Sequence, residues 1–347
     1  MPYAPHSRTK GKAPGELLLI DRIRARTSAF PSTAVRLGIG DDCAILKPPP
    51  GHELLVTTDF SLEGRHFRRS SGKNAWHSPA SIGHRTLARG LSDLAAMGAK
   101  PLAAFLSLAL PKSAARNTHW LDGFLDGLLA LANTYNVPLA GGDTSESPSN
   151  HILADIVLIG SAPAGRALRR STARPGDLLY CTGSLGGAAA ELTALAASPH
   201  KFRKAIAADA HPHLFPQPRL ATGAALLRRR LATSCIDLSD GLSTDLAHLC
   251  TASRVSAEID AAALPLHPLA QRLNPGPALH AALHGGEDYE LLFTAPATAK
   301  LPRSLGGVRL TKIGRIVPTR KPRPQMTLID RDGRRSALTP QGWEHLT

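Results

Sequence analysis

Gly38-Ile-Gly-Asp-Asp-Cys-Ala-Ile-Leu46, Lys47-Pro-Pro-Pro-Gly51 and Leu54-Leu-Val-Thr-Thr-Asp-Phe-Ser-Leu-Glu-Gly-Arg-His66 make up the stretch that decides the fold. Two short apolar runs in it each carry acidic residues at one end, Asp41 and Asp42 in the first and Asp59 in the second. Proline and glycine in the connection are typical of a turn. We therefore expect the two runs to form neighbouring strands of a hairpin.

Oxygen donors gather at the ends of these two predicted strands. Carboxylates on neighbouring strand ends converge, and their mutual repulsion is costly without a cation. Thr57 and Thr58, beside Asp59, add hydroxyl and carbonyl oxygens. Such a set suits Mg²⁺ and phosphate. A solvated hairpin with surface acids explains the same residues, and this stretch alone leaves the two interpretations about even.

The length and composition indicate a globular protein with two domains. The chain has 347 residues, more than the roughly 150 of one domain, and a hydrophobic content of 43%. No apolar run approaches the roughly 18 residues of a membrane span, and residues 102–110, among the longest, suit a buried strand. Residues 1–12 are polar and basic, so we expect neither a secretory signal nor a membrane partner.

The four cysteines lie at positions 43, 181, 235 and 250 and include no Cys-x-x-Cys pair. In a chain of this size, scattered single cysteines indicate a reducing compartment rather than a disulfide framework. We therefore expect a cytoplasmic protein.

The chain carries a formal charge of +14, which permits contact with polyanions. Its basic residues are spread out, however, and aromatic residues make up only 4% of the chain. Proteins that bind single-stranded nucleic acid normally interleave stacking aromatics with their cations. We therefore expect a generally basic, solvated surface rather than a nucleic-acid partner.

Hydrophobic periodicity divides the chain into two halves that both alternate helices with strands. It predicts helices over residues 15–26, 117–135 and 219–230, a helix ending at Met97-Gly98, an Ala-rich helix from about Gly187, and strands over residues 102–110, 152–160 and 178–182. An Arg-rich segment, residues 164–175, resembles a domain connection. We expect an α+β fold of α/β type, with a flexible basic tail over residues 1–14, an N-terminal domain over 15–163 and a C-terminal α/β domain over 164–347.

Further acidic turns recur along the chain. Gly141-Gly-Asp-Thr144 combines glycines, which let backbone approach a phosphate, with an acid that could hold a metal ion. Asp237, Ser239 and Asp240 lie at a strand-turn-helix junction, where capping of the helix would explain one of the three acceptors. Asp93 lies at the margin of an apolar helix stripe, either as a solvated edge residue or as an acid aimed into a cleft.

Together these turns indicate phosphoryl transfer assisted by several metal ions. Six aspartates lie in Gly-flanked turns or near the ends of elements: Asp42, Asp59, Asp93, Asp143, Asp237 and Asp240. Neutralisation of a crowded polyphosphate by Mg²⁺ needs such a set. The sequence signatures of P-loop, zinc-protease, α/β-hydrolase and protein-kinase sites are absent.

Six ordered motifs carry a resemblance to a known family. They are Gly38-Ile-Gly-Asp-Asp, Thr57-Thr-Asp, Leu91-Ser-Asp-Leu-Ala-Ala-Met-Gly-Ala99, Gly141-Gly-Asp-Thr144, Asp237-Leu-Ser-Asp-Gly-Leu242 and Gly285-Gly-Glu-Asp-Tyr-Glu-Leu291. From about Gly15 to Trp343 the chain resembles the thiamine-monophosphate kinases, in the superfamily typified by aminoimidazole ribonucleotide synthetase. The resemblance implies a homodimer whose N-terminal sheets pair into a β-barrel, with ATP and several Mg²⁺ ions near the domain boundary. It also implies direct, Mg-assisted, in-line transfer of the ATP γ-phosphoryl group onto thiamine monophosphate, giving thiamine diphosphate.

The resemblance assigns roles to individual residues, none of them a catalytic acid, base or nucleophile. The family's metal positions match Asp42, Thr57, Thr58, Asp59, Asp93, Asp143, Asp237 and Asp240. Its nucleotide positions match Gly142, Asp143, Arg170 and Ser239, and its substrate positions match His66, Glu287 and Trp343. The last three suit their roles, because a carboxylate can pair with a cationic ring and a tryptophan can stack on it.

The chain departs from the family pattern at three places. Ser145-Glu146-Ser147 follows Gly-Gly-Asp-Thr where the family has Thr-Arg-Gly, Gly187 replaces an aspartate, and Gly90 replaces an asparagine. Because no matched metal position is lost, we expect a kinase with altered nucleotide affinity or rate. The alternatives are another ATP-using enzyme of the superfamily, of the purine-pathway synthetase type, and a weakened, basic nucleic-acid-binding relative.

Overall fold

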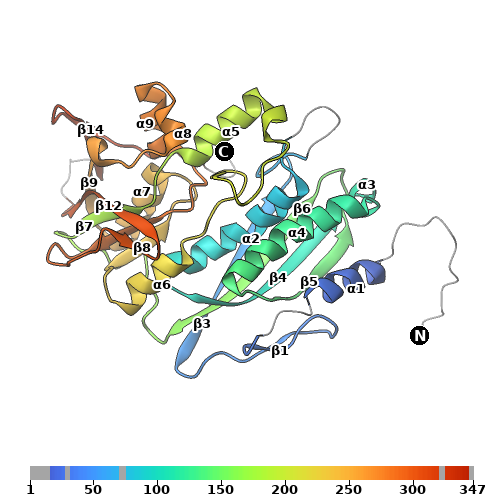
Figure 1. The fold of residues 1–347 in the computed structure, drawn as a ribbon. Helices are drawn as coiled ribbons and strands as arrows, with labels where there is room; N and C mark the ends of the chain where they lie inside the picture. Colours follow the sequence, from blue (N-terminus) through green and yellow to red (C-terminus); the bar gives the residue numbers. More distant parts are fainter. Residues whose placement is uncertain (1–15, 28–31, 70–75, 320–324, 344–347) are drawn as a thin grey trace, which may run out of the picture.

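The computed structural model describes residues 16–27, 32–69, 76–319 and 325–343, with side chains from residue 20 onward. The tail predicted over residues 1–14 lies outside the described residues. Figure 1 shows two sheet-and-helix parts, with the N-terminal part at the right and the C-terminal part at the left. None of the helices within the described ranges is long and apolar enough to span a membrane.

The N-terminal part contains a four-stranded sheet. Its spatial order is β3 (His52–Leu62), β6 (Leu153–Pro163), β4 (Lys100–Leu110) and β5 (Leu139–Glu146). β6 pairs antiparallel with both β3 and β4, whereas β4 and β5 are parallel. β3 and β5 are therefore the two edges of an open sheet.

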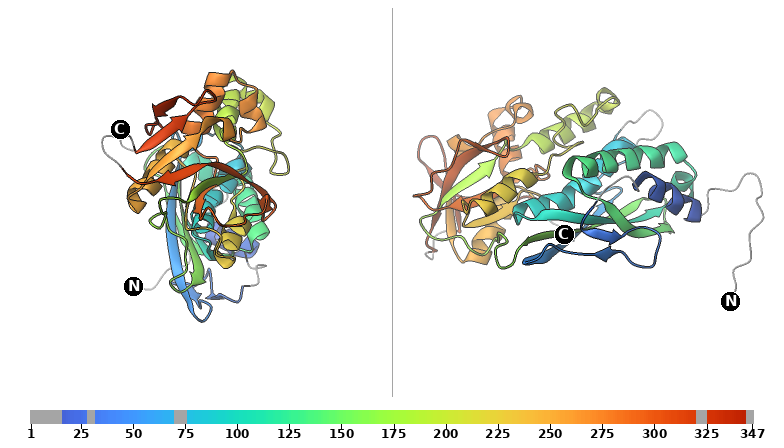
Figure 2. Two further views of the ribbon diagram at one scale, coloured as in Figure 1. Left: turned by 90° about the vertical axis from the view of Figure 1, so that its left-hand side faces the viewer. Right: turned by 60° about the horizontal axis from the view of Figure 1, so that its bottom comes forward.

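Two helices cover one face of this sheet: α2 (Pro79–Ala96) and α4 (Thr118–Tyr135), as Figures 1 and 2 show. Glycines allow the two helices to pack closely. A Cβ atom on Gly83 would lie 1.9 Å from the carbonyl oxygen of Phe124, and one on Gly127 would lie 1.8 Å from that of Ala80. Two shorter helices, α1 (Glu16–Thr27) and α3 (Lys112–Ala115), complete this part. The tight packing fixes the position of α2 above the sheet.

The C-terminal part is built on an eight-stranded sheet. Its path runs β14 (Arg335–Ala337), β13 (Met326–Ile329), β9 (Ser256–Asp260), β12 (Val308–Val317), β7 (Leu178–Thr182), β10 (Leu291–Ala295) and β8 (Ser234–Asp237), with β11 (Ser304–Leu305) paired to β12. Only β9 and β13 pair in parallel along this path. Its helices are α5 (Gly187–Ala197), η1 (Pro199–Phe202), α6 (Leu220–Arg228), α7 (Leu242–Ser253), η2 (Ala261–Ala263), α8 (Pro268–Gln271) and α9 (Pro275–His284).

A shared hydrophobic cluster joins the two parts. Leu87 and Leu91 of α2 belong to the same cluster of buried side chains as Leu226 of α6 and Phe293 of β10. Burial of each such side chain contributes about 1.5–3 kcal/mol. A second cluster fills the C-terminal part alone. The shared core holds α2 against the C-terminal sheet, and this contact positions the site described below.

The predicted α+β class is confirmed, and several elements are close to their predicted bounds. The strand predicted over residues 178–182 is β7, and the helix predicted over 117–135 is α4. Asn117 caps α4, because its Oδ1 accepts a hydrogen bond from the N–H of Trp120 over 3.1 Å. All four cysteines are unpaired.

The predicted hairpin across residues 47–51 is wrong. β2 (Ile45–Leu46) pairs with β1 (Val35–Leu37), whereas β3 pairs with β6 along all 11 of its residues. The three prolines of the connection have no N–H groups to donate to a ladder, and β6 offers β3 a far longer one. As a result, Asp42 and Asp59 lie in different cavities.

Candidate active site

A cavity of about 370 Å³, called here the acidic cavity, lies where the two parts meet. The N-terminal part contributes residues of β3, α2 and the segment after β3. The C-terminal part contributes residues of α5, of the turn between β8 and α7, and of the segment before β10. Eight of the predicted site residues line this cavity: Asp59, His66, Asp93, Asp237, Ser239, Asp240, Glu287 and Trp343.

β3 directs its two predicted threonines to opposite faces of the sheet. Thr57 lies on the covered face, where its Oγ1 donates a hydrogen bond to Oδ2 of Asp93 on α2. Thr58 lies on the open face, where its Oγ1 donates to Oδ1 of Asp155 on β6 over 2.7 Å. Alternation of side chains along a strand imposes this division. The Thr58 hydroxyl therefore faces away from the acidic cavity, and its predicted role in binding a metal ion stays a prediction.

Three aspartates from three elements meet in the acidic cavity: Asp59 of β3, Asp93 of α2 and Asp237 of β8. Burial, and next the charge of Asp93, raise the pKa of Asp59 to about 7 and that of Asp237 to about 7. Oδ2 of Asp59 is buried without a hydrogen-bond partner in the described part of the chain. Oδ2 of Asp237 accepts a hydrogen bond from Oγ of Ser92 over 2.6 Å. The cluster therefore holds more negative charge than its surroundings compensate.

This excess of negative charge fits a divalent cation. Among the described residues, no three His, Cys, Asp or Glu side chains form a ready-made metal site. Mg²⁺ in phosphoryl-transfer sites is usually held by one or two carboxylates, with water and substrate phosphates completing its coordination. The unpartnered Oδ2 of Asp59 and the raised pKa values of Asp59 and Asp237 suit such a site. Asp59, Asp93, Asp237 and Asp240 are the cavity residues that fit Mg²⁺.

The turn between β8 and α7 presents Ser239 and Asp240 to the acidic cavity. Gly241 precedes the helix with a φ of 111°, a backbone conformation that suits glycine. Oδ2 of Asp245 accepts hydrogen bonds from the N–H groups of Asp240 and Gly241, both over 3.1 Å. The N-cap position of α7 is taken by Gly241, so the prediction that Asp237, Ser239 or Asp240 caps this helix is wrong; Asp245 instead holds the turn that precedes it.

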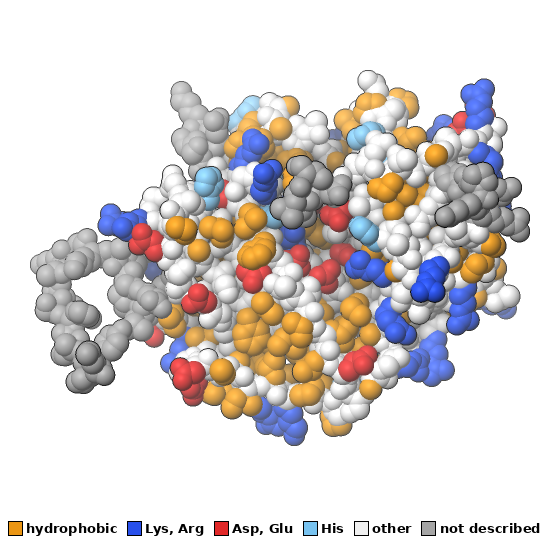
Figure 3. All heavy atoms as spheres, turned by 180° about the vertical axis from the view of Figure 1, so that it is seen from behind, with side chains coloured by type: hydrophobic (Ala, Val, Ile, Leu, Met, Phe, Trp, Pro, Cys, Tyr) orange, Lys and Arg blue, Asp and Glu red, His pale blue; other side chains and the backbone are white. Residues whose placement is uncertain are grey.

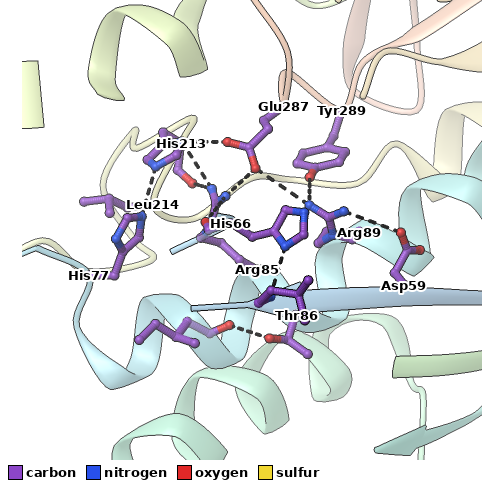
Figure 4. Close-up of polar contacts among 12 residues, drawn as sticks. Asp59, His66, His77, Arg85, Thr86, Arg89, His213, Leu214, Glu287 and Tyr289 are labelled. Atoms are coloured by element: carbon purple, nitrogen blue, oxygen red, sulfur yellow. Dashed lines mark hydrogen bonds and ion pairs between the residues drawn. The ribbon is translucent and has the colours of Figure 1, made fainter. Parts of the chain in front are cut away.

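Arg85 and His213 hold Glu287 in place (Figure 4). Its Oε1 forms an ion pair with Arg85, and its Oε2 lies 3.1 Å from Nδ1 of His213. The N–H of Glu287 donates to the carbonyl oxygen of Ser239 over 2.8 Å. Burial alone would raise the pKa of Glu287, but Arg85 and then His213 outweigh it and hold that pKa well below its usual range. Glu287 is therefore a carboxylate at neutral pH.

The other two predicted substrate residues line the same cavity as Glu287. Nδ1 of His66 accepts a hydrogen bond from the N–H of Leu62 over 3.0 Å, which sets the orientation of the ring. The side chain of Trp343 belongs to a residue that is 48% exposed, and the backbone N–H of Trp343 donates to the carbonyl oxygen of Asp240 over 3.1 Å. A tryptophan that lines a cavity and stays half exposed can stack on an entering cationic ring.

Four further side chains of this site were missed from the sequence: Arg85, Arg89, His213 and Tyr289. Arg85 and Arg89 lie one turn apart on one face of α2, next to its apolar stripe. Arginine is almost never buried without a partner. Two arginines next to the apolar stripe of a helix could therefore have been selected from the sequence as candidates for a buried contact. His213 and Tyr289 carried none, because their contacts depend on tertiary packing.

A second cavity, of about 820 Å³, contains Asp42, Gly142 and Asp143. Asp143 pairs with Ser107, and Ser107 pairs with Asp155, across β5, β4 and β6. Residues paired across a sheet point to the same face, and the contact of Asp155 with Thr58 marks that face as the open one. These predicted metal and nucleotide residues therefore lie apart from the carboxylates of the acidic cavity.

Arg170 lies in the connection between the two parts. Its side chain is exposed, and its carbonyl oxygen accepts a hydrogen bond from Oγ of Ser253 over 2.7 Å. Its charge opposes the rise in the pKa of Asp237. Arg170 is therefore within electrostatic reach of the acidic cavity, which is compatible with a phosphate contact.

Replacing Asp237 with asparagine is expected to stabilise the metal-free protein at pH 8. The unfolded Asp237 loses its proton near its ordinary pKa of 3.8, whereas the folded one keeps it to about 7. Ionisation of Asp237 therefore lowers the free energy of unfolding increasingly as the pH rises between these values. Asparagine keeps the acceptor for Ser92. We expect a melting temperature higher by about 2–5 °C in EDTA at pH 8, and a smaller gain at pH 5, by scanning calorimetry. A melting temperature lowered equally at both pH values would contradict this account.

Comparisons with known proteins cover most of the chain. Two family models match: AIR synthase related protein, N-terminal domain, over residues 40–162, and AIR synthase related protein, C-terminal domain, over residues 174–326. The chain is 42% identical to a thiamine-monophosphate kinase of Escherichia coli (strain K12) over 342 residues, which cover 95% of this chain and 98% of that protein. It is 32% identical to that of Bacillus subtilis (strain 168) over 337 residues, covering 95% and 99%.

Solved structures share the fold. A thiamine-monophosphate kinase from Stenotrophomonas maltophilia K279a matches with a TM-score of 0.77 and 37% identity, covering 92% of this chain and 97% of that one. A structure described as AaThiL complexed with AMPPCP and TMP matches with a TM-score of 0.72 and 30% identity, covering 96% and 97%. Hydrogenase maturation protein HypE in complex with ATP has a TM-score of 0.72 but 17% identity over 97% of each chain, so that likeness concerns the fold alone.

Proposed function

The chain belongs to the family of thiamine-monophosphate kinases, and from this premise we propose that it phosphorylates thiamine monophosphate to thiamine diphosphate with ATP. The observation that carries this function is the acidic cavity, which combines a cluster of carboxylates with Glu287 and Trp343. The carboxylates suit Mg²⁺, which in turn binds phosphate, whereas Glu287 and Trp343 suit a cationic ring. Thiamine monophosphate presents both a phosphate and a cationic ring.

Phosphoryl transfer is proposed to be direct and to need no general base. The second ionisation of a phosphate monoester lies near pH 6, so the acceptor is mostly dianionic at neutral pH. The task left to the protein is to hold two anionic groups in line. Mg²⁺ bound by Asp59, Asp93, Asp237 and Asp240 would neutralise phosphate charge. Glu287, His66 and Trp343 hold and orient the ring of the acceptor.

The nucleotide is proposed to bind with the help of Asp42, Gly142 and Asp143 in the second cavity. The volume of that cavity falls within the range of ligand sites. Gly142 has a φ of 147°, and a Cβ atom there would lie 1.9 Å from the carbonyl oxygen of Leu106, so the backbone conformation requires glycine. Arg170 and Ser239 are proposed to contact the phosphates. Asp42 and Asp143 would hold Mg²⁺ in this second cavity.

A coupled assay tests the proposed function. ADP release is followed in the presence of ATP and Mg²⁺, with thiamine monophosphate or thiamine as the acceptor. We expect ADP release only with thiamine monophosphate, accompanied by thiamine diphosphate on chromatography. ADP release at the same rate with and without an acceptor would contradict the function.

A second copy of the chain is proposed to cover the open face of the N-terminal sheet. Leu54, Val56 and Phe60 of β3 are 47%, 65% and 60% exposed. Figure 3 shows hydrophobic side chains gathered on this side of the molecule. Exposed apolar areas of this kind mark protein interfaces. Pairing of two such sheets would give the barrel that the family resemblance implies.

Replacing Val56 with glutamate is expected to weaken the dimer about a hundredfold, because a buried, unpaired carboxylate is costly in an apolar interface. Sedimentation velocity at a series of protein concentrations measures this change. The matched control is Ile206→Glu, since Ile206 is 54% exposed in the C-terminal part. Equal behaviour of the two variants would show that this face is not the interface.

Two further proposals concern organisation and location. A domain boundary at residues 163/164 is supported by the family models, which match residues 40–162 and 174–326 separately. A cytoplasmic location is supported by the four unpaired cysteines, which suit a reducing compartment.

A further inference from the structure

Arg89 lines the acidic cavity, one helical turn after Arg85 and one before Asp93 on α2. Its side chain is 15% exposed. Its guanidinium lies 3.7 Å from Oδ1 of Asp59 and 3.8 Å from Oε1 of Glu287 (Figure 4). Arg89 thus stands between the carboxylate cluster and the group that suits the cationic ring.

The guanidinium of Arg89 makes few hydrogen bonds in this position. Its Nη1 donates to the hydroxyl oxygen of Tyr289 over 3.4 Å, a long contact. Its Nε is buried and has no hydrogen-bond partner among the residues that the structure describes. The two carboxylates attract it at distances beyond those of hydrogen bonds. The Nη groups, which lie near Asp59 and Glu287 without hydrogen-bonding to them, therefore keep N–H donors for a ligand.

Arg85 provides a contrast one turn earlier on the same helix. Its Nη1 donates to the carbonyl oxygen of His213, and its Nη2 donates to that of His66 over 3.1 Å and to Glu287. Arg85 is thus committed to protein acceptors and fixes the cavity wall. Arg89 is also mostly buried but lacks such hydrogen bonds to protein carbonyl and carboxylate oxygens. This pattern is expected of an arginine that donates hydrogen bonds to a ligand.

We propose that Arg89 binds the phosphate of the acceptor, thiamine monophosphate; this inference rests on the proposed function. The ethyl arm of this substrate separates its cationic ring from its phosphate. A ring held at Glu287 and Trp343 therefore places the phosphate toward Asp59, on a path that passes Arg89. The fork of guanidinium N–H groups matches the oxygens of a phosphate, and the contact is charge-assisted.

This assignment gives Arg89 a role that the aspartates cannot have. Asp59, Asp93 and Asp237 repel a phosphate unless a cation intervenes, whereas Arg89 attracts it directly. Thiamine, which ends in a hydroxyl group, gains little from the same arginine. Arg89 therefore makes the site selective for the phosphorylated acceptor.

The test compares the binding of thiamine monophosphate and thiamine by calorimetry, in Mg²⁺ without ATP, for the full-length protein and its Arg89→Met and Arg89→Lys variants. We expect Arg89→Met to lower the affinity for thiamine monophosphate about 10- to 100-fold more than the affinity for thiamine. Arg89→Lys keeps the charge beside Asp59 and Glu287 but loses the fork, so a smaller selective loss is expected. Trp343→Ala is the comparison variant, because loss of stacking should weaken both ligands by the same factor.

The outcomes separate this inference from the proposed function and from a structural role. If both variants weaken thiamine and thiamine monophosphate equally, Arg89 only balances the charges of Asp59 and Glu287, and the inference is overturned. Melting temperatures show whether each variant folds. If Arg89→Met does not fold, the binding of the two ligands to Arg89→Lys decides whether Arg89 contributes selectivity. If the unmodified protein does not turn over thiamine monophosphate in the coupled assay, the proposed function itself fails. Normal turnover together with unchanged selectivity in the variants overturns the inference alone.

Discussion

Replacing Asp93 with asparagine is expected to lower kcat for thiamine diphosphate formation about a thousandfold, the scale of a lost electrostatic group in an active site. Asp93 lines the acidic cavity, and its charge is the main charge that raises the pKa of both Asp59 and Asp237. Its Oδ2 also accepts the hydrogen bond of Thr57. Asparagine keeps that acceptor and the shape of the side chain but removes the negative charge.

The measurement is steady-state kinetics of the coupled assay, with ATP and thiamine monophosphate varied in turn. The matched control is Asp126→Asn on the neighbouring helix α4, where an exposed ion pair with Arg26 contributes little. We expect kcat of the control to stay within about twofold of the unmodified protein. If kcat of Asp93→Asn falls by less than tenfold, Asp93 serves the packing of α2 against β3 and not the reaction.

Local signals explain why much of the fold could be predicted from the sequence. Asn117 caps α4, and Asn136 ends it in the left-handed conformation with a φ of 54°. Strand β7 needed only a short apolar run between turns to be placed correctly. Such features depend on residues a few positions apart, which a single sequence displays directly.

The two wrong predictions share a cause, which is competition from a partner distant in space or overlooked along the chain. The hairpin predicted at residues 47–51 does not form, because β3 pairs with β6 over 11 residues instead. These two strands are far apart in the sequence. The predicted cap of α7 does not form, because Gly241 takes the N-cap position and Oδ2 of Asp245 holds the preceding turn through the N–H groups of Asp240 and Gly241. In the second case, the loss of a capping role leaves Ser239 and Asp240 lining the acidic cavity.

The candidate site shows the same limit. Asp59, Asp93 and Asp237 could be selected by residue type and surroundings, but only the fold shows that they share a cavity and that Asp143 lies elsewhere. The contact of Arg85 with Glu287 could not be predicted for a stronger reason. Arg85 precedes Glu287 by about two hundred positions in the chain, and nothing local to either residue indicates their contact.

Removing divalent metal is expected to have the largest effect on activity. EDTA should lower the rate of thiamine diphosphate formation at least a thousandfold, because Asp59, Asp93, Asp237 and Asp240 would then repel the phosphates that they must help to bind. On adding Mg²⁺ back, the rate should keep rising beyond one equivalent per ATP, because two separate groups of aspartates fit the metal.

A readout independent of turnover accompanies this titration. The melting temperature in the presence of the non-hydrolysable nucleotide AMPPCP should rise with Mg²⁺ past the point where the nucleotide alone is saturated with metal, because ligands that bind only the folded state stabilise it. Asp93→Asn should shift this second rise to higher Mg²⁺, whereas Asp126→Asn should not. Saturation of both rate and melting temperature at one equivalent of Mg²⁺ per nucleotide would mean that these aspartates hold no metal beyond that of the nucleotide.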